Sequence, residues 1–166
     1  YTEPNGEDCY WSRGNGWVVA ALVKVLEELP EGHPDRDLYL TDLKKMCAAL
    51  LKVQRKDGFW NASLHDSTHY GGKETTGTSL FLYGMAWGLN QGVLDSNTYM
   101  PAVKLGWNAL LDDAVHENGF LGYVQSTGKE PSTGMPLSYD KIPDFEDYGL
   151  GCFLLAGSEI YKLAKN

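Results

Sequence analysis

The sequence predicts an all-α protein, a partial α/α toroid in which helical hairpins follow one another around a ring. Three observations predict this fold. Five stretches carry apolar residues at helical spacing, the first, third and fifth of them share one opening pattern, and the second and fourth each close on a Gly-Phe pair. The chain has 166 residues, 43% hydrophobic and 22% charged, which is enough to bury a core.

The first hairpin is expected near the beginning of the chain. From Val18 to Leu29, apolar residues recur at the spacing of one broad helical face. Pro30, Gly32 and Pro34 interrupt that pattern. A second helix is expected from about Asp35 to Val53, where the charged turn RKDG follows it.

Three further helices complete the pattern. The third, from Thr78 to Leu89, is apolar on most of its faces. The fourth is expected from Thr98 to Val115, with Pro101 in its first turn, where the missing N–H does no harm. The last runs from Gly149 to Ala164.

The shared openings are GNGWVVAA, GTSLFLYG and GLGCFLLA, which begin 63 and 72 residues apart at Gly14, Gly77 and Gly149. These three helices are largely apolar, whereas the second and fourth are amphipathic. Concentric layers require this difference, because only the outer layer meets water. A plain helical bundle is the alternative, and the repeat weighs against it.

In a toroid, the inner helices all begin at one rim, so the segments before them converge there. Residues 7–13, 69–75 and 144–148 each contain an aromatic residue and at least one carboxylate. The positive ends of the helices also face this rim and favour an anionic ligand. Aromatic faces for stacking, arginine for a carboxylate and acids for proton transfer together indicate a pocket for an acidic sugar.

The motif WSRGNGW, from Trp11 to Trp17, resembles the W-x-RGNGW signature of the family 105 glycoside hydrolases, the unsaturated rhamnogalacturonyl hydrolases. The related unsaturated glucuronyl hydrolases carry a looser version. Two more blocks are similar to segments of that family: ETTGTSLF, from Glu74, and DYGLGCFLLAGSE, from Asp147. The three blocks keep the family's order and extend over most of the chain.

The resemblance implies an (α/α)6 toroid of six hairpins, of which this sequence holds about three. Residues 1–166 are therefore expected to form a single all-α domain, the C-terminal half of such an enzyme. The implied reaction is hydration of the vinyl ether of a 4,5-unsaturated uronic acid at the end of a pectin-derived oligosaccharide. It uses one acid/base group and needs no metal or cofactor. The family's catalytic aspartate, second pocket aspartate and pocket histidine lie upstream of the motif, so this chain offers no assigned catalytic residue.

The motif also implies which residues bind the substrate. Arg13 would hold the uronate carboxylate or neighbouring sugar oxygens, and Trp11 and Trp17 would wall the pocket. The glycines of the motif would let a turn pass close to the ligand. For Trp17 the alternative is simple packing at the start of a helix.

Four other residues are candidates for the same rim. Glu74 and Thr75 would contact the ligand, or else cap the third helix. His69 would lie on the rim, although a lone loop histidine is more often solvated. Met135, in the long loop 126–144 that is rich in Ser, Thr, Gly and Pro, would cover the pocket as part of a lid.

The net charge of −8, without a basic stripe, argues against nucleic acid as a partner. No apolar run has the roughly 20 residues of a membrane-spanning helix. Three cysteines without CxxC spacing support neither a disulfide framework nor a zinc site.

In half a toroid, the apolar run of the third helix would lack upstream partners, which predicts exposed side chains and either self-association or compact closure. The run comprises Leu80, Phe81, Leu82, Tyr83 and Met85.

Two other functions remain open. The chain could be a non-catalytic carbohydrate-binding or assembly unit that uses the same rim without an acid. It could also belong to another α/α toroid, such as a lyase or a sugar epimerase. Such enzymes should show a rim of His and Tyr bases, for which only His69 is available here.

Overall fold

The computed structural model describes residues 2–141 and 147–165. Within these residues the regular structure is helical, with isolated β-bridges between loops and no strand. This confirms the all-α prediction. The elements are α1 (Ser12–Glu28), α2 (Arg36–Lys52), α3 (Thr75–Asn90), α4 (Ser96–Ala109), the π-helical turn η1 (Leu110–Ala114) and α5 (Asp147–Leu163).

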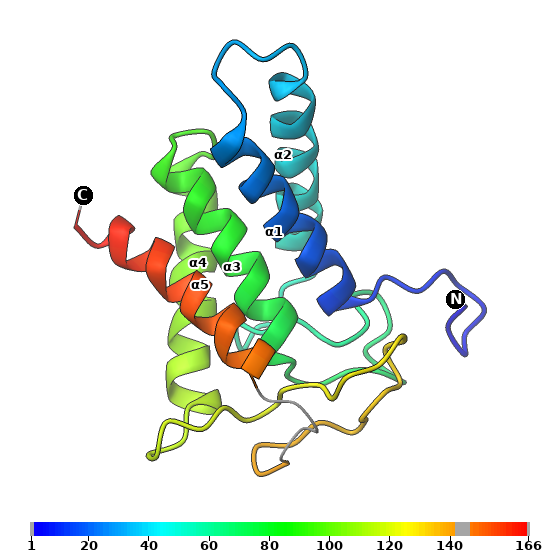
Figure 1. The fold of residues 1–166 in the computed structure, drawn as a ribbon. Coiled ribbons are helices and arrows are strands. Elements are labelled where there is room, and N and C mark those ends of the chain that lie inside the picture. The colour runs from blue at the N-terminus through cyan, green and yellow to red at the C-terminus, as the bar shows by residue number, and fades with distance from the viewer. Residues whose placement is uncertain (1, 142–146, 166) are drawn as a thin grey trace.

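The helices form two layers, as the repeat predicts. Helix α3 packs between α1 and α5, and all three begin at the same end of the molecule (Figure 1). Helix α2 returns against α1, and α4 returns against α3. The arrangement is an arc of an α/α toroid with three inner and two outer helices.

Helix α1 begins earlier than its apolar pattern indicates. Its first residue is Ser12, so the glycines of the motif WSRGNGW lie in the first turns of the helix and not in a turn before it. A Cβ atom on Gly16 would lie 3.0 Å from Leu80, and one on Gly77 would lie 2.0 Å from Ser12 Oγ. The glycines thus let α1 and α3 approach closely, which corrects the expectation that they make room for a ligand.

Helix α4 also begins early, at Ser96, so Pro101 lies in its second turn and not in its first.

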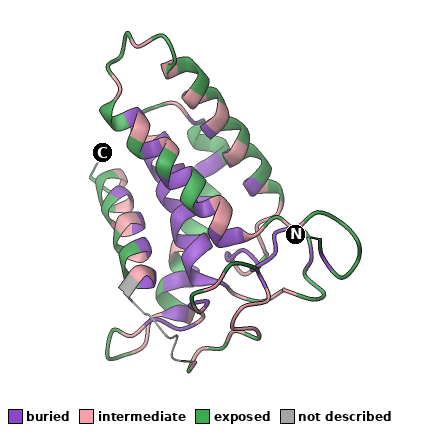
Figure 2. Cartoon of the chain, turned by 45° about the vertical axis from the view of Figure 1, so that its right-hand side comes forward, coloured by how far each residue is buried: buried purple, intermediate pink, exposed green. Residues whose placement is uncertain are grey.

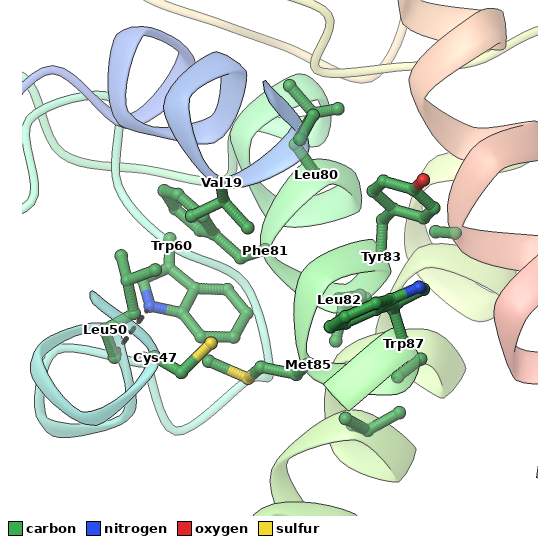
Figure 3. Packing of buried hydrophobic residues seen from close by; sticks show 14 of the residues in the cluster. Val19, Cys47, Leu50, Trp60, Leu80, Phe81, Leu82, Tyr83, Met85 and Trp87 are labelled. Atoms are coloured by element: carbon green, nitrogen blue, oxygen red, sulfur yellow. Dashed lines mark hydrogen bonds between the residues drawn. The ribbon is translucent and has the colours of Figure 1, made fainter. Parts of the chain in front are cut away.

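Helix α3 is buried at every residue from Thr75 to Gly88 (Figure 2). The expectation that its apolar run is exposed is therefore wrong, because α1, α4 and α5 already cover it. Trp60, from the loop after α2, packs edge to face on Phe81 at 5.4 Å between ring centroids (Figure 3). Its indole N–H donates to the Leu50 carbonyl at 2.8 Å, which ties the outer helix α2 to this core.

Exposed apolar side chains lie instead on the outer helices, such as Leu38 of α2, and on the two edges of the arc. Trp17 and Val18 of α1 are 46% and 49% exposed, and Leu150 and Leu154 of α5 are 46% and 59% exposed. Among the described residues, no helix is both long and apolar enough to cross a membrane.

Candidate functional site

The three inner helices begin at one rim, as predicted. Arg13 of α1 donates to the hydroxyl oxygen of Tyr148, in the first turn of α5, at 3.0 Å. Gly77, in the first turn of α3, lies against Ser12. Of the predicted rim segment 144–148, residues 144–146 lie outside the described part of the chain.

A hollow of about 310 Å³ opens at this rim. It is walled by the starts of α1 and α5 on one side and by the loop after η1 on the other. Its lining residues are Trp11, Arg13, Trp17, Thr127, Gly128 and Tyr148. Three of the seven candidate residues from the sequence therefore meet at one hollow, and the exposed Trp17 presents an aromatic surface there.

Arg13 lines this hollow but is only 4% exposed. Its guanidinium lies between the rings of Trp11, 4.7 Å away, and Tyr148, 5.3 Å away. Its N–H groups donate to the carbonyls of Gln125, at 2.7 Å, and Ser126, at 3.1 Å. Arg13 thus uses most of its contacts to bind the loop after η1, which forms the opposite wall of the hollow.

Gln125 is a residue of this rim that the motif does not indicate. It is fully buried, and its side-chain oxygen accepts the indole N–H of Trp11 at 2.9 Å. Its amide nitrogen donates to the carbonyls of Pro131, at 2.8 Å, and Thr133, at 2.9 Å. A glutamine beside a Ser- and Gly-rich segment has no periodicity that would mark it as buried.

Glu74 and Thr75 fix the start of α3. The Glu74 carboxylate accepts the backbone N–H groups of Thr76, at 2.9 Å, and Gly77, at 2.6 Å, as an N-cap. Burial raises the pKa of this carboxyl above its ordinary value of 4.5. The Thr75 hydroxyl donates to the Gly122 carbonyl at 2.7 Å. Both side chains are buried and neither lines the hollow. The geometry therefore favours the capping interpretation for Glu74, whereas Thr75 caps no N–H group and instead ties the start of α3 to the loop at Gly122.

His69 and Met135 also lie outside the set of residues that line the hollow. The Nδ1 atom of His69 is 2.7 Å from a carboxylate oxygen of the buried Asp66, which holds the histidine in its own loop. Met135 is half-buried in the loop after η1. Among the residues that the structure describes, no group of histidine, cysteine and carboxylate side chains is arranged to hold a metal ion.

An arc of helical hairpins, with inner helices that begin at a shared rim and outer helices that return, places the chain in the class of α/α toroids. The model of Glycosyl Hydrolase Family 88 matches residues 1–164, and the chain belongs to this family. A curated relative from Formosa agariphila, 42% identical over 161 residues, is named an unsaturated 3S-rhamnoglycuronyl hydrolase. That match covers 97% of this chain and 41% of the relative, so the chain spans less than half of the relative's length.

Solved structures share the fold. A family 88 glycosyl hydrolase from Bacteroides vulgatus is 37% identical with a TM-score of 0.89, over 96% of this chain and 45% of that one. A protein described as a polysaccharide lyase is 36% identical with a TM-score of 0.91, over 100% of this chain and 46% of that one. A family 105 hydrolase from C. acetobutylicum is 25% identical with a TM-score of 0.78, over 97% and 48%. The resemblance to this group of toroid enzymes is confirmed.

Proposed function

We propose that the complete protein removes a 4,5-unsaturated uronic acid from the end of a rhamnose-containing oligosaccharide. The observation that carries the proposal is the hollow in which Trp11, Trp17 and Tyr148 meet at the common rim. Flat aromatic faces pack against the C–H faces of sugar rings. The name of the Formosa agariphila relative, an unsaturated 3S-rhamnoglycuronyl hydrolase, supports this class of substrate.

The chemistry is hydration of an enol ether. An acid protonates C4 of the unsaturated ring, water adds at C5, and the resulting hemiketal opens and releases the saccharide. One group that gives a proton and later accepts one is sufficient. Glu74 does not suit this role, because it is fully buried and its oxygens accept bonds from α3. Because the family resemblance places the catalytic aspartate upstream of WSRGNGW and the chain covers 41% of its Formosa agariphila relative, we assign the acid to a part of the protein outside this chain.

The role of this chain is to supply one wall of the substrate site. Trp17 offers the accessible ring, and Thr127 and Gly128 face it across the hollow. Arg13 supports that loop through two backbone carbonyls and keeps a positive charge at the rim, which favours a uronate.

The rest of the protein is proposed to cover the edges of the arc. The outward face of α5 exposes Leu150, Leu154 and Tyr161, and a second hollow of about 260 Å³ lies between α4 and α5. Exposed apolar faces of this kind mark interaction surfaces. In sedimentation, residues 1–166 alone should self-associate; a clean monomer would contradict the proposal.

The sign of one absorbance change tests the reaction. The complete protein is incubated with an unsaturated uronyl–rhamnose disaccharide, and the ultraviolet absorbance of the conjugated double bond is followed. A hydrolase of this type consumes the double bond, so absorbance falls. In a second reaction that offers the parent polysaccharide, a lyase would create such bonds, so absorbance would rise. Binding of the disaccharide without any change would support the non-catalytic carbohydrate-binding alternative.

A further inference from the structure

Gln125 forms the centre of the hydrogen bonds that hold the hollow together. Its side-chain oxygen accepts from Trp11 of α1, and both of its amide donors are used, on Pro131 and Thr133 of the following loop. Its backbone carbonyl accepts from Arg13 and from the hydroxyl of Tyr148, at the starts of α1 and α5. One residue thus joins two inner helices and the loop opposite them.

These contacts define the orientation of the carboxamide completely. If the amide were flipped, its NH2 group would face the indole N–H of Trp11, and its oxygen would face two carbonyls. A buried polar group costs free energy unless its partners are in place. The position of Trp11 and the path of residues 131–133 are therefore determined together.

The backbone just before Gln125 is held in an uncommon conformation. Tyr123 has φ of 57°, in the left-handed region that a bulky residue rarely adopts. Its carbonyl accepts the N–H of Thr75 at 3.0 Å, and its N–H donates to the Ser138 carbonyl at 3.0 Å. The ammonium group of Lys73 lies 5.4 Å from the centre of its ring. The strained turn is anchored on several sides, and it leads the chain into the buried position of Gln125.

We propose that Gln125 is a positioning residue for the substrate. It holds the Trp11 ring and residues 126–133 so that Thr127 and Gly128 stand at a fixed distance from Trp17. Gln125 itself is fully buried, so it acts through these neighbours and not by contact with the sugar. This inference rests on the proposed function, because it concerns the width of the same hollow.

The experiment compares the buried Gln125 with the half-buried Gln54 in the complete protein. Gln125→Met keeps the length of the side chain and removes its three hydrogen bonds. Gln54 is the matched control, because its amide also donates to two backbone carbonyls, those of Gly58 and Ala102, at 3.0 and 3.1 Å. Gln54 and Gly58 lie in the loop after α2, and Ala102 lies in the outer helix α4, so these contacts are not part of the hollow.

For Gln125→Met we expect KM for the unsaturated disaccharide to rise about tenfold or more, with a smaller change in kcat. Gln54→Met should lower the unfolding midpoint and leave KM unchanged. Gln125→Glu should also raise KM. A carboxylate can still accept the N–H of Trp11, but it cannot donate to the carbonyls of Pro131 and Thr133, so the loop loses both of its bonds to this side chain. In hydrogen exchange, both Gln125 variants should lose protection over residues 126–133.

The inference is overturned if Gln125→Met lowers the unfolding midpoint as Gln54→Met does but keeps the KM of the wild type. Wild-type turnover tests the proposed function separately. If the wild type binds the disaccharide in calorimetry without consuming it, the proposed reaction is wrong, and a loss of affinity in Gln125→Met still supports the positioning role. If the wild type neither consumes nor binds the disaccharide, both proposals fail.

Discussion

The close approach of α1 and α3 predicts that Gly77→Ala destabilises the protein. The added Cβ would lie 2.0 Å from Ser12 Oγ and 2.9 Å from both the Ser12 carbonyl carbon and a Glu74 carboxylate oxygen. Carbon atoms in contact normally stand about 3.5–4.0 Å apart. A new rotamer of Ser12 would remove only the clash with Oγ. To relieve the clash with the Ser12 carbonyl carbon, α1 must shift away from α3 by roughly 0.6–1 Å.

Overpacking of this kind costs about 1–3 kcal/mol. Alanine recovers up to roughly 1 kcal/mol of helix propensity over glycine. Because one of the clashes is with the backbone, we expect a net loss near the upper end, about 2 kcal/mol in the free energy of unfolding. Urea denaturation of residues 1–166, followed by circular dichroism, measures this loss.

The matched control is Gly151→Ala in α5. A Cβ there meets nothing within 4 Å, so only the helix propensity remains. This variant should be as stable as the wild type or more stable, by up to about 1 kcal/mol. If Gly77→Ala proved as stable as Gly151→Ala, the account of why small residues recur at the start of the inner helices would be refuted.

Three further predictions concern a cap, an ion pair and the hollow. Glu74→Ala leaves two buried N–H groups of α3 without their acceptor and should cost about 2 kcal/mol or more, measured by urea denaturation. Asp95→Ala removes the exposed cap of α4 and should cost less, about 1 kcal/mol, so equal losses would contradict the role of burial. The hydrogen bond from Arg55 holds the pKa of the Asp57 carboxyl below its ordinary value of 3.8. The folded state therefore favours the charged Asp57 carboxylate. The ion pair stabilises the fold at pH values above the ordinary pKa of 3.8, and this stabilisation is lost as the pH falls through the lower pKa of the folded state. Asp57→Asn should therefore lower the free energy of unfolding at pH 7 by about 1 kcal/mol or less, because both side chains of the pair are about a third exposed. The difference from the wild type should shrink in acid. A difference that stays constant with pH would show that the ion pair does not cause it. Trp17→Ala should raise KM for the disaccharide about tenfold, whereas Leu38→Ala, an exposed apolar residue of the outer helix α2, should leave it unchanged. Equal KM values for these two variants would remove Trp17 from the site.

The layers of the fold could be predicted from the sequence because a helix that is buried on all sides needs apolar residues on all its faces. Helix α3 is apolar on nearly every face and is buried on nearly every face. The start of α1 was harder to predict, because glycine and serine resemble a turn when read alone. They favour a helix here only because Leu80 and Gly77 of α3 lie against them.

The site could be predicted only in part, because some of its residues are brought together by long-range contacts. Trp11, Arg13 and Trp17 share one short motif and meet at one hollow. Gln125 and Tyr148 join them through contacts that span more than 100 residues of sequence, and no local pattern encodes such contacts. Glu74 shows the opposite case, because a carboxylate before a helix has the same sequence signature whether it caps the helix or faces a ligand.

The most direct test of the central claim is a crystal structure of the complete protein with the unsaturated uronyl–rhamnose disaccharide bound. We expect the unsaturated ring in the hollow between Trp17 and the loop at Thr127 and Gly128, with Arg13 still bound to the carbonyls of Gln125 and Ser126. A disaccharide bound away from this rim, with the hollow occupied only by solvent, would contradict the account.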